Sequence, residues 1–238
     1  MGVTARDARE IIHRLFLNLG MTAMEILYMP ALNKDNIRGL VSFDRPDILW
    51  EALAKKRGVV MLACHMDNWE WLGAALASTA FPSVQWKSPS PIRCTAIFSM
   101  SCAGAWDRKS SPGAPTRSWL RPGHEKGPDA GAHRRPGRGL PRIFVPFFGK
   151  MASTPEGPAY FARKFKAPVV PIFMVRKPSG YGHQVFVKEP IYYEDTGNQE
   201  KDDYRITLKM TQEVEKIIRQ YPDNWIWFQH RWNTPWNG

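Results

Sequence analysis

The chain of 238 residues is long enough to bury a core, and its 43% hydrophobic and 23% charged residues exclude a disordered protein. A formal net charge of +11 indicates a negatively charged partner, and the ten tryptophans and twelve phenylalanines favour a membrane surface over nucleic acid. No apolar run of about 18 residues and no secretory signal pattern is present, so we expect membrane contact to be peripheral. The three cysteines form no paired or zinc-binding pattern, which predicts a reducing compartment without structural disulfides.

Hydrophobic periodicity predicts an alternation of helices and strands in the first third of the chain. In chain order we expect a helix over 5–32, a strand around Ile37 to Phe43, a helix from Pro46 to Lys56, a strand buried on both faces from Gly58 to Cys64, and a helix from Trp69 to Leu76. Asn68 is the candidate N-cap of the last helix.

The last third is equally regular. It predicts a strand from Ile143 to Phe148, a helix from Pro155 to Phe165, a buried strand from Pro168 to Val175, a strand from Tyr181 to Glu189, and an amphipathic helix from Asp203 to Tyr221. This alternation is typical of a single α/β domain over 1–238, with a central mixed, largely parallel sheet flanked by helices.

The middle of the chain does not match its flanks. Residues 91–139 contain seven glycines, six prolines, and nine basic against three acidic residues, and they supply +6 of the net charge. This composition predicts a basic loop or a disordered segment. So long a structureless stretch is unusual inside a compact domain, which makes the segment atypical.

The most informative residues run from Cys64 to Glu70. His65 follows the buried strand and Glu70 lies in the first turn of the next helix, and the carboxyl ends of strands are where α/β sheets place active sites. Side chains five positions apart point about 140° away from each other on one helix, so the two can meet only because a turn intervenes. A carboxylate bonded to one ring nitrogen leaves the other nitrogen as a general base.

Such a pair could deprotonate an alcohol for attack on an activated acyl carbonyl. No G-x-S-x-G motif indicates an acyl-enzyme, and Cys64 should point to the opposite face of the strand from His65. From spacing alone, two alternatives stay open. His65 could cap the strand end while Asp67 and Glu70 are solvated, or His65, Asp67 and Glu70 could bind a metal, although H-E-x-x-H is absent.

Three blocks of this chain together resemble one known family. Gly58 to Gly73 (GVVMLACHMDNWEWLG) is similar to the H-x4-(D/E) block of the lipid A biosynthesis late acyltransferases, the lauroyl and myristoyl transferases, within the wider lysophospholipid acyltransferase group. Phe144 to Ala159, followed by the Ala167 to Pro171 stretch, resembles a second block, and Trp225 to Trp232 resembles the C-terminal signature. The resemblance covers roughly 5–90 and 140–236, in the family's order.

The resemblance implies a glycerolipid acyltransferase-like fold and a role for each matched residue. His65 would be the general base on an acceptor hydroxyl, and Glu70 would orient it and stabilise the imidazolium. Substrate-binding positions would be Asn68, Trp69, Phe147, Gly149, Thr154, Gly157 and Arg231. Other interpretations remain open: the glycines could serve turns only, Phe147 could belong to the core, and Arg231 could be a basic surface residue rather than a phosphate contact.

The chain departs from the family pattern in two places. Members usually begin with an apolar anchor helix, so we expect this chain to be N-terminally truncated. Residues 91–139 stand where the family has a helix-rich stretch and an Asp-Gln-Asp motif. When 127–139 is back-translated with ordinary codons and the bases are read one position along, an apolar run followed by that motif appears, so we interpret 91–139 as a frame-shifted or disordered segment.

The expected protein is an acyltransferase at the cytoplasmic face of the inner membrane. It would move a fatty acyl chain from acyl carrier protein to a hydroxyl of a lipid A precursor or related glycolipid, with no cofactor and no metal. Its partners would be acyl carrier protein and an anionic lipid acceptor, and not nucleic acid. The alternatives are a lysophospholipid or other glycolipid acyltransferase, or a catalytically inactive membrane-binding remnant.

Overall fold

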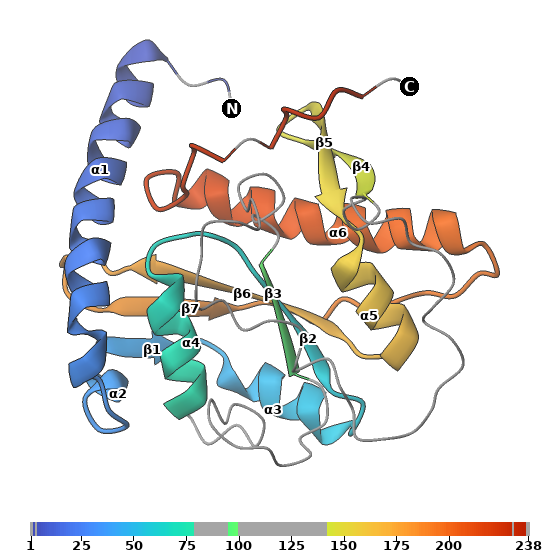
Figure 1. Cartoon of the computed structure of the whole chain (residues 1–238), viewed down its shortest axis with the longest axis horizontal. Helices are drawn as coiled ribbons and strands as arrows, with labels where there is room; N and C mark the ends of the chain where they lie inside the picture. Colours follow the sequence, from blue (N-terminus) through green and yellow to red (C-terminus); the bar gives the residue numbers. More distant parts are fainter. Residues whose placement is uncertain (1, 3, 79–94, 100–141, 230, 237–238) are drawn as a thin grey trace, which may run out of the picture.

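A five-stranded mixed sheet forms the centre of the protein (Figure 1), in a computed structural model that describes residues 2, 4–78, 95–99, 142–229 and 231–236. Its strands, in spatial order, are β1 (Val41–Phe43), β7 (His183–Val187), β6 (Val169–Arg176), β2 (Val59–Ala63) and β3 (Thr95–Ser99). The β6–β7 pair is antiparallel and the other three pairs are parallel. The prediction of an α/β fold with a mixed, largely parallel sheet is confirmed.

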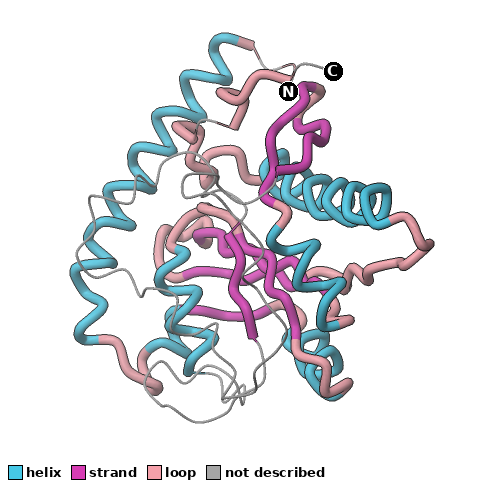
Figure 2. Tube along the Cα trace, turned by 45° about the vertical axis from the view of Figure 1, so that its right-hand side comes forward, coloured by secondary structure: helices cyan, strands magenta, loops and turns pink. Residues whose placement is uncertain are grey.

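Helices cover both faces of this sheet, as Figures 1 and 2 show. One face packs against α5 (Gly157–Phe165) and α6 (Gln199–Gln220), and the other packs against α2 (Ile37–Leu40), α3 (Pro46–Ala54) and α4 (Trp69–Ser78). Strand β2 contributes to both, because successive side chains of a strand point to opposite faces. Val60 and Leu62 belong to the first core, and Val59, Met61 and Ala63 belong to the second.

A long N-terminal helix, α1 (Ala5–Tyr28), runs along one edge of the molecule and continues as the 3-10 turn η1 (Met29–Ala31) (Figure 1). It begins with a capping box in which the Thr4 and Asp7 side chains satisfy each other's backbone N–H groups. Only Leu15 and Thr22 of this helix are buried. Within the described part of the chain, no helix is long and apolar enough to cross a membrane.

A separate hairpin lies beside α6 and is made by β4 (Arg142–Phe147) and β5 (Lys150–Pro155). Its two-residue loop, Phe148 and Gly149, has φ values of +51° and +78°. This pair of left-handed residues is what a tight two-residue hairpin requires, and glycine adopts such a conformation without steric cost. The loop is further held by the Phe148 N–H, which donates to Glu215 Oε2 of α6 at 2.7 Å.

Three sequence predictions need correction. Ile37 to Leu40, predicted as part of a strand, is the short helix α2, and only Val41–Phe43 extends. Pro155, predicted to begin a helix, ends strand β5, and the helix starts at Gly157. The prediction of an irregular stretch over 91–139 is wrong for Thr95–Ser99, which pairs with β2, and the rest of that segment lies outside the described residues.

Candidate active site

The turn between β2 and α4 carries both predicted catalytic residues. The strand ends at Ala63 and the helix begins at Trp69, so His65 lies in the turn and Glu70 in the helix's first turn. Asp67 adopts a φ of +50°, a left-handed conformation that reverses the chain direction. The Asn68 side chain accepts from the Trp71 N–H at 3.0 Å, which confirms its role as N-cap of α4.

Trp69 contacts both His65 and Glu70. Its ring meets the His65 imidazole edge-on, with centroids 4.8 Å apart and an interplanar angle of 90°. Its indole N–H donates to Glu70 Oε1 at 3.0 Å. Burial lowers the pKa of His65 below its ordinary value of 6.5, which favours the neutral imidazole that a general base requires. Glu70 is exposed, so its side chain is accessible to solvent.

The C-terminal segment pairs with the same turn from the other side. Met66 forms an isolated antiparallel bridge with Trp225. The Asp67 N–H donates to the Asn224 carbonyl at 2.8 Å, and the Ile226 N–H donates to the His65 carbonyl at 3.3 Å. These bonds satisfy backbone groups of the turn, so its shape depends on residues about 160 positions later in the sequence.

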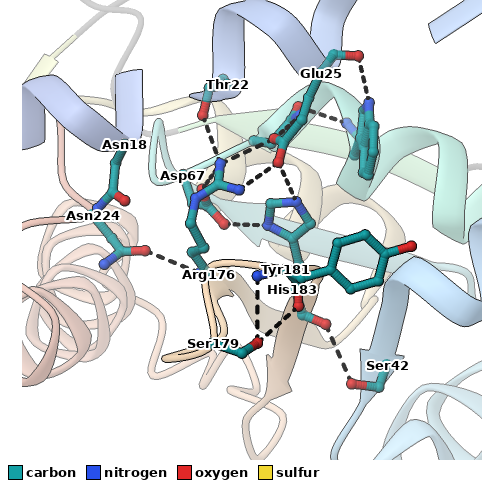
Figure 3. Close-up of polar contacts among 12 residues, drawn as sticks. Asn18, Thr22, Glu25, Ser42, Asp67, Arg176, Ser179, Tyr181, His183 and Asn224 are labelled. Atoms are coloured by element: carbon teal, nitrogen blue, oxygen red, sulfur yellow. Dashed lines mark hydrogen bonds and ion pairs between the residues drawn. The ribbon is translucent and has the colours of Figure 1, made fainter. Parts of the chain in front are cut away.

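Behind the turn lies a cluster of four ionisable side chains, shown in Figure 3. Asp67 accepts from Arg176 Nη2 at 3.0 Å through Oδ1 and contacts His183 Nδ1 at 2.5 Å through Oδ2. Arg176 also makes a bidentate pair with Glu25 of α1, with Nη2 to Oε2 at 3.0 Å. His183 Nε2 lies 3.3 Å from Glu25 Oε1. Sequence analysis missed this cluster, and it overturns the interpretation of Asp67 as a solvated residue.

The charged side chains of this cluster are largely buried, and burial opposes their ionisation. The side chains of Asp67 and His183 are 0% exposed, that of Arg176 is 4% exposed, and that of Glu25 is 18% exposed. Glu25 also lines a cavity of about 490 Å³ beside Tyr28, Trp71 and Tyr181. Burial opposes ionisation of Glu25, but hydrogen bonds from His183, Arg176 and Asn68 outweigh it and lower its pKa to about 2. Burial likewise opposes a charged His183, but its bonds to Asp67 and Glu25 prevail and raise its pKa.

The predicted substrate-binding residues of the second block form a different group. Arg231 donates from Nη1 to the Ser153 carbonyl at 3.0 Å and from Nη2 to Thr154 Oγ1 at 3.1 Å. Its guanidinium also lies over the Phe147 ring, 5.1 Å from the centroid. Burial, together with the nearby charge of Arg142, lowers the pKa of Arg231 to about 10. The interpretation of Arg231 as a basic surface residue is therefore wrong.

The remaining residues of that block lie in the hairpin and at the start of α5. Gly149 is exposed in the hairpin loop, whereas Gly157 is buried at the start of α5. Phe147 is buried in the core, where it stacks on Trp232 with centroids 5.6 Å apart and meets Trp225 at 6.4 Å. Because Trp225 also bridges Met66, it connects the second group to the turn after β2. The structure thus places His65, Asn68, Trp69 and Glu70 at one turn, where Trp69 contacts His65 and Glu70, and groups Phe147, Thr154 and Arg231 separately.

The metal site that the sequence left open, with His65, Asp67 and Glu70 as ligands, is not formed. Asp67 points into the buried cluster while Glu70 is exposed. Among the residues that the structure describes, no three His, Cys, Asp or Glu side chains are arranged to hold a metal ion.

Comparison with known sequences identifies the family. The profile of the bacterial lipid A biosynthesis acyltransferases matches residues 1–82 and 139–234. The chain belongs to this family. The lipid A biosynthesis lauroyltransferase of Escherichia coli (strain K12) is 30% identical over 118 residues, a match that covers 49% of this chain and 33% of that protein. The family profile leaves out 83–138, which contains nearly all of the segment with atypical composition.

Proposed function

We propose that this protein is an acyltransferase that moves a fatty acyl chain from acyl carrier protein to a hydroxyl of a lipid A precursor or a related glycolipid. Membership of the lipid A biosynthesis acyltransferase family supports the reaction class. The observation that carries the proposal is the turn after β2, where Trp69 contacts both His65 and Glu70 and where burial favours a neutral imidazole.

In the proposed reaction His65 takes the proton of the acceptor hydroxyl as its oxygen attacks the thioester carbonyl. The carbonyl becomes a tetrahedral oxyanion, which collapses by breaking the carbon–sulfur bond. The departing thiolate takes the proton back from the His65 imidazolium, so no enzyme-bound acyl group forms. Glu70 stabilises the transient imidazolium, and the Trp69 indole N–H fixes the position of the Glu70 carboxylate.

The acceptor of the proposed reaction is a lipid, so the protein must reach a membrane surface. Helix α1 presents an apolar face of exposed side chains that recur at helical intervals, among them Ile12, Phe16, Met24 and Leu27. Phe16 also packs on Phe228, with centroids 5.6 Å apart, and Phe228 is itself exposed. Such a face is suited to lie in the headgroup region of a bilayer, and we propose peripheral attachment to the cytoplasmic face of the inner membrane.

The direct test is transfer of a radiolabelled acyl group from acyl carrier protein to a lipid A precursor by the purified chain. We expect His65→Ala to lower kcat/KM by about 10³-fold, since general base catalysis contributes on the order of 10²–10⁴. Glu70→Gln should lower it by about 10²-fold, whereas Glu51→Gln, an exposed glutamate of α3, should leave it unchanged.

Two other results would change the proposal. Transfer to lysophospholipids but not to the lipid A precursor would keep the chemistry and replace the acceptor. Salt-sensitive binding to anionic vesicles without turnover on any acceptor would contradict the acyltransferase and identify a membrane-binding remnant. A version with the frame of 91–139 restored should then be tested in parallel, because the family match omits most of that segment.

A further inference from the structure

We infer that Asp67, Arg176 and His183 are positioning residues that hold the turn between His65 and Glu70 in its active shape, with Glu25 tying helix α1 to the same cluster. This inference rests on the proposed function. None of the four needs to contact substrate. They act through the backbone and the helix start that carry the two catalytic candidates.

The turn needs an external constraint because of its own geometry. Asp67 lies midway between the catalytic candidates and adopts a φ of +50°, which residues with a side chain rarely adopt. Such a conformation costs free energy, which surrounding contacts offset. Here the Asp67 N–H is bonded to the Asn224 carbonyl at 2.8 Å, and both carboxylate oxygens have partners.

The cluster fixes the start of α4 as well as the turn. Asn68 Oδ1 caps the helix through the Trp71 N–H, while its Nδ2 donates to Glu25 Oε2 at 2.9 Å. The Trp71 indole N–H in turn donates to the Glu25 carbonyl at 3.1 Å. Glu70 is in the first turn of this helix, so the direction of its side chain follows from where the helix begins.

The strand ends that supply Arg176 and His183 are also paired with each other in the sheet. Arg176 is the last residue of β6 and His183 is the first of β7, and these two residues are paired directly in the antiparallel ladder. The Arg176 N–H also donates to Asn224 Oδ1 at 3.0 Å, so the segment that bonds the Asp67 backbone is tied to the same strand end. The cluster therefore couples the position of the turn to the paired ends of β6 and β7.

Charge balance explains why the cluster can be buried. Two carboxylates, Asp67 and Glu25, face one guanidinium and one imidazole, so the cluster is neutral when His183 is protonated. Removal of any one charge leaves the others uncompensated in a largely buried site, and such groups then move or recruit water. We therefore expect a substitution that removes one of these charges to displace the turn.

The test uses Asp67→Asn with Asp203→Asn as its matched control. Asp203 is also a buried aspartate, 5% exposed and paired with Arg163 at 3.2 Å, but it lies on α6 away from the turn. We expect Asp67→Asn to lower kcat about 30-fold with less than a twofold change in KM for donor and acceptor. It should also move the pH at which the His65 NMR resonance titrates. The control should be destabilised without either change.

Glu25→Gln serves if Asp67→Asn does not fold, because Glu25 is the most exposed member and glutamine keeps its shape. A folded variant of either kind with wild-type kcat and an unmoved His65 titration would overturn the inference, as would equal losses in Asp203→Asn. If the wild-type chain transfers no acyl group, the proposed function fails, and the His65 titration alone decides whether the cluster positions the turn.

Discussion

Asp67 and His183 meet at 2.5 Å between Oδ2 and Nδ1 in a part of the core where neither side chain is exposed. The His183 ring also packs edge-on against Trp71, with centroids 5.4 Å apart. An aspartate from the turn after β2 is thereby joined to the first residue of β7, which lies two strands away in the sheet. The turn that carries His65 and Glu70 is part of an ionic core rather than a free loop.

The His183 contacts predict that stability falls as pH rises. Because its folded pKa is raised above 6.5, protonated His183 contributes stability that is fully present below 6.5 and is lost as pH rises through the folded pKa. The slope should reach about 1.4 kcal/mol per pH unit between the two pKa values. Urea unfolding at a series of pH values from 5 to 9 measures it. His183→Gln should remove this component, and an unchanged slope in that variant would contradict the assignment.

Glu25 predicts a second pH dependence of opposite sign at acid pH. Its pKa is lowered from 4.5 to about 2, so its contribution is present above 4.5 and is lost as pH falls through about 2. Glu25→Gln should cost on the order of 2 kcal/mol at pH 7 and make the remaining stability less sensitive to acid. Unfolding of both proteins between pH 2 and 7 measures the difference. The two curves should converge at the acid end, and a constant offset down to pH 2 would count against the ion pair.

His65 predicts the acid limb of the proposed reaction. Burial lowers its pKa, so the imidazole stays neutral below pH 6.5 and activity should be retained there. The kcat/KM profile should fall only as pH drops through a value below 6.5. Trp69→Phe keeps the ring against His65 but removes the N–H bond to Glu70, so we expect about tenfold lower kcat with the same acid limb. An acid limb above 6.5 would contradict a buried general base.

The hydrogen bonds of Arg231 predict that the hairpin strand β5 depends on this side chain for its stability. Arg231→Met removes the donors to the Ser153 carbonyl and Thr154 Oγ1, so buried acceptors lose their partners at a cost of about 2–3 kcal/mol. Thr154→Ser keeps the hydroxyl and should cost less than half as much. Hydrogen exchange on β5 would report the loosening directly. Full retention of stability in Arg231→Met would indicate that its contacts are replaceable by solvent.

The exposed apolar face of α1 predicts affinity for a membrane surface. Phe16→Ser should weaken binding to anionic vesicles about tenfold, because a buried phenylalanine contributes on the order of 1.5–3 kcal/mol. Tyr204→Ser, an equally simple loss of an exposed aromatic side chain on α6, is the control and should bind as wild type. Vesicle sedimentation measures both. Equal losses in the two variants would place the membrane contact elsewhere.

Local features of the fold followed from the sequence. The run of apolar residues before His65 predicted a doubly buried strand, and Asn68 predicted the cap of α4, because both depend on neighbouring residues alone. Ile37 to Leu40 was predicted as part of a strand because a four-residue segment with apolar residues only at its two ends fits a strand and a short helix equally well. Strand β5 was missed because its residues carry little apolar alternation and are held by pairing with β4.

The ionic cluster was beyond the reach of local patterns. Glu25 and Arg176 are separated by 151 residues, and Asp67 and His183 by 116, so only the folded sheet brings them together. The one signal in the sequence was an arginine at the end of an otherwise apolar strand, where a buried charge requires a partner. The catalytic candidates were accessible because strand end, turn and helix start are contiguous. Their roles stay predictions.

The most direct test of the account is transfer of a radiolabelled acyl group from acyl carrier protein to a lipid A precursor, measured for the wild-type chain, His65→Ala and Glu51→Gln under identical conditions. The account predicts turnover by wild type and Glu51→Gln and a loss of about 10³-fold in His65→Ala. Equal turnover by a folded His65→Ala variant would contradict the role of this turn as the active site.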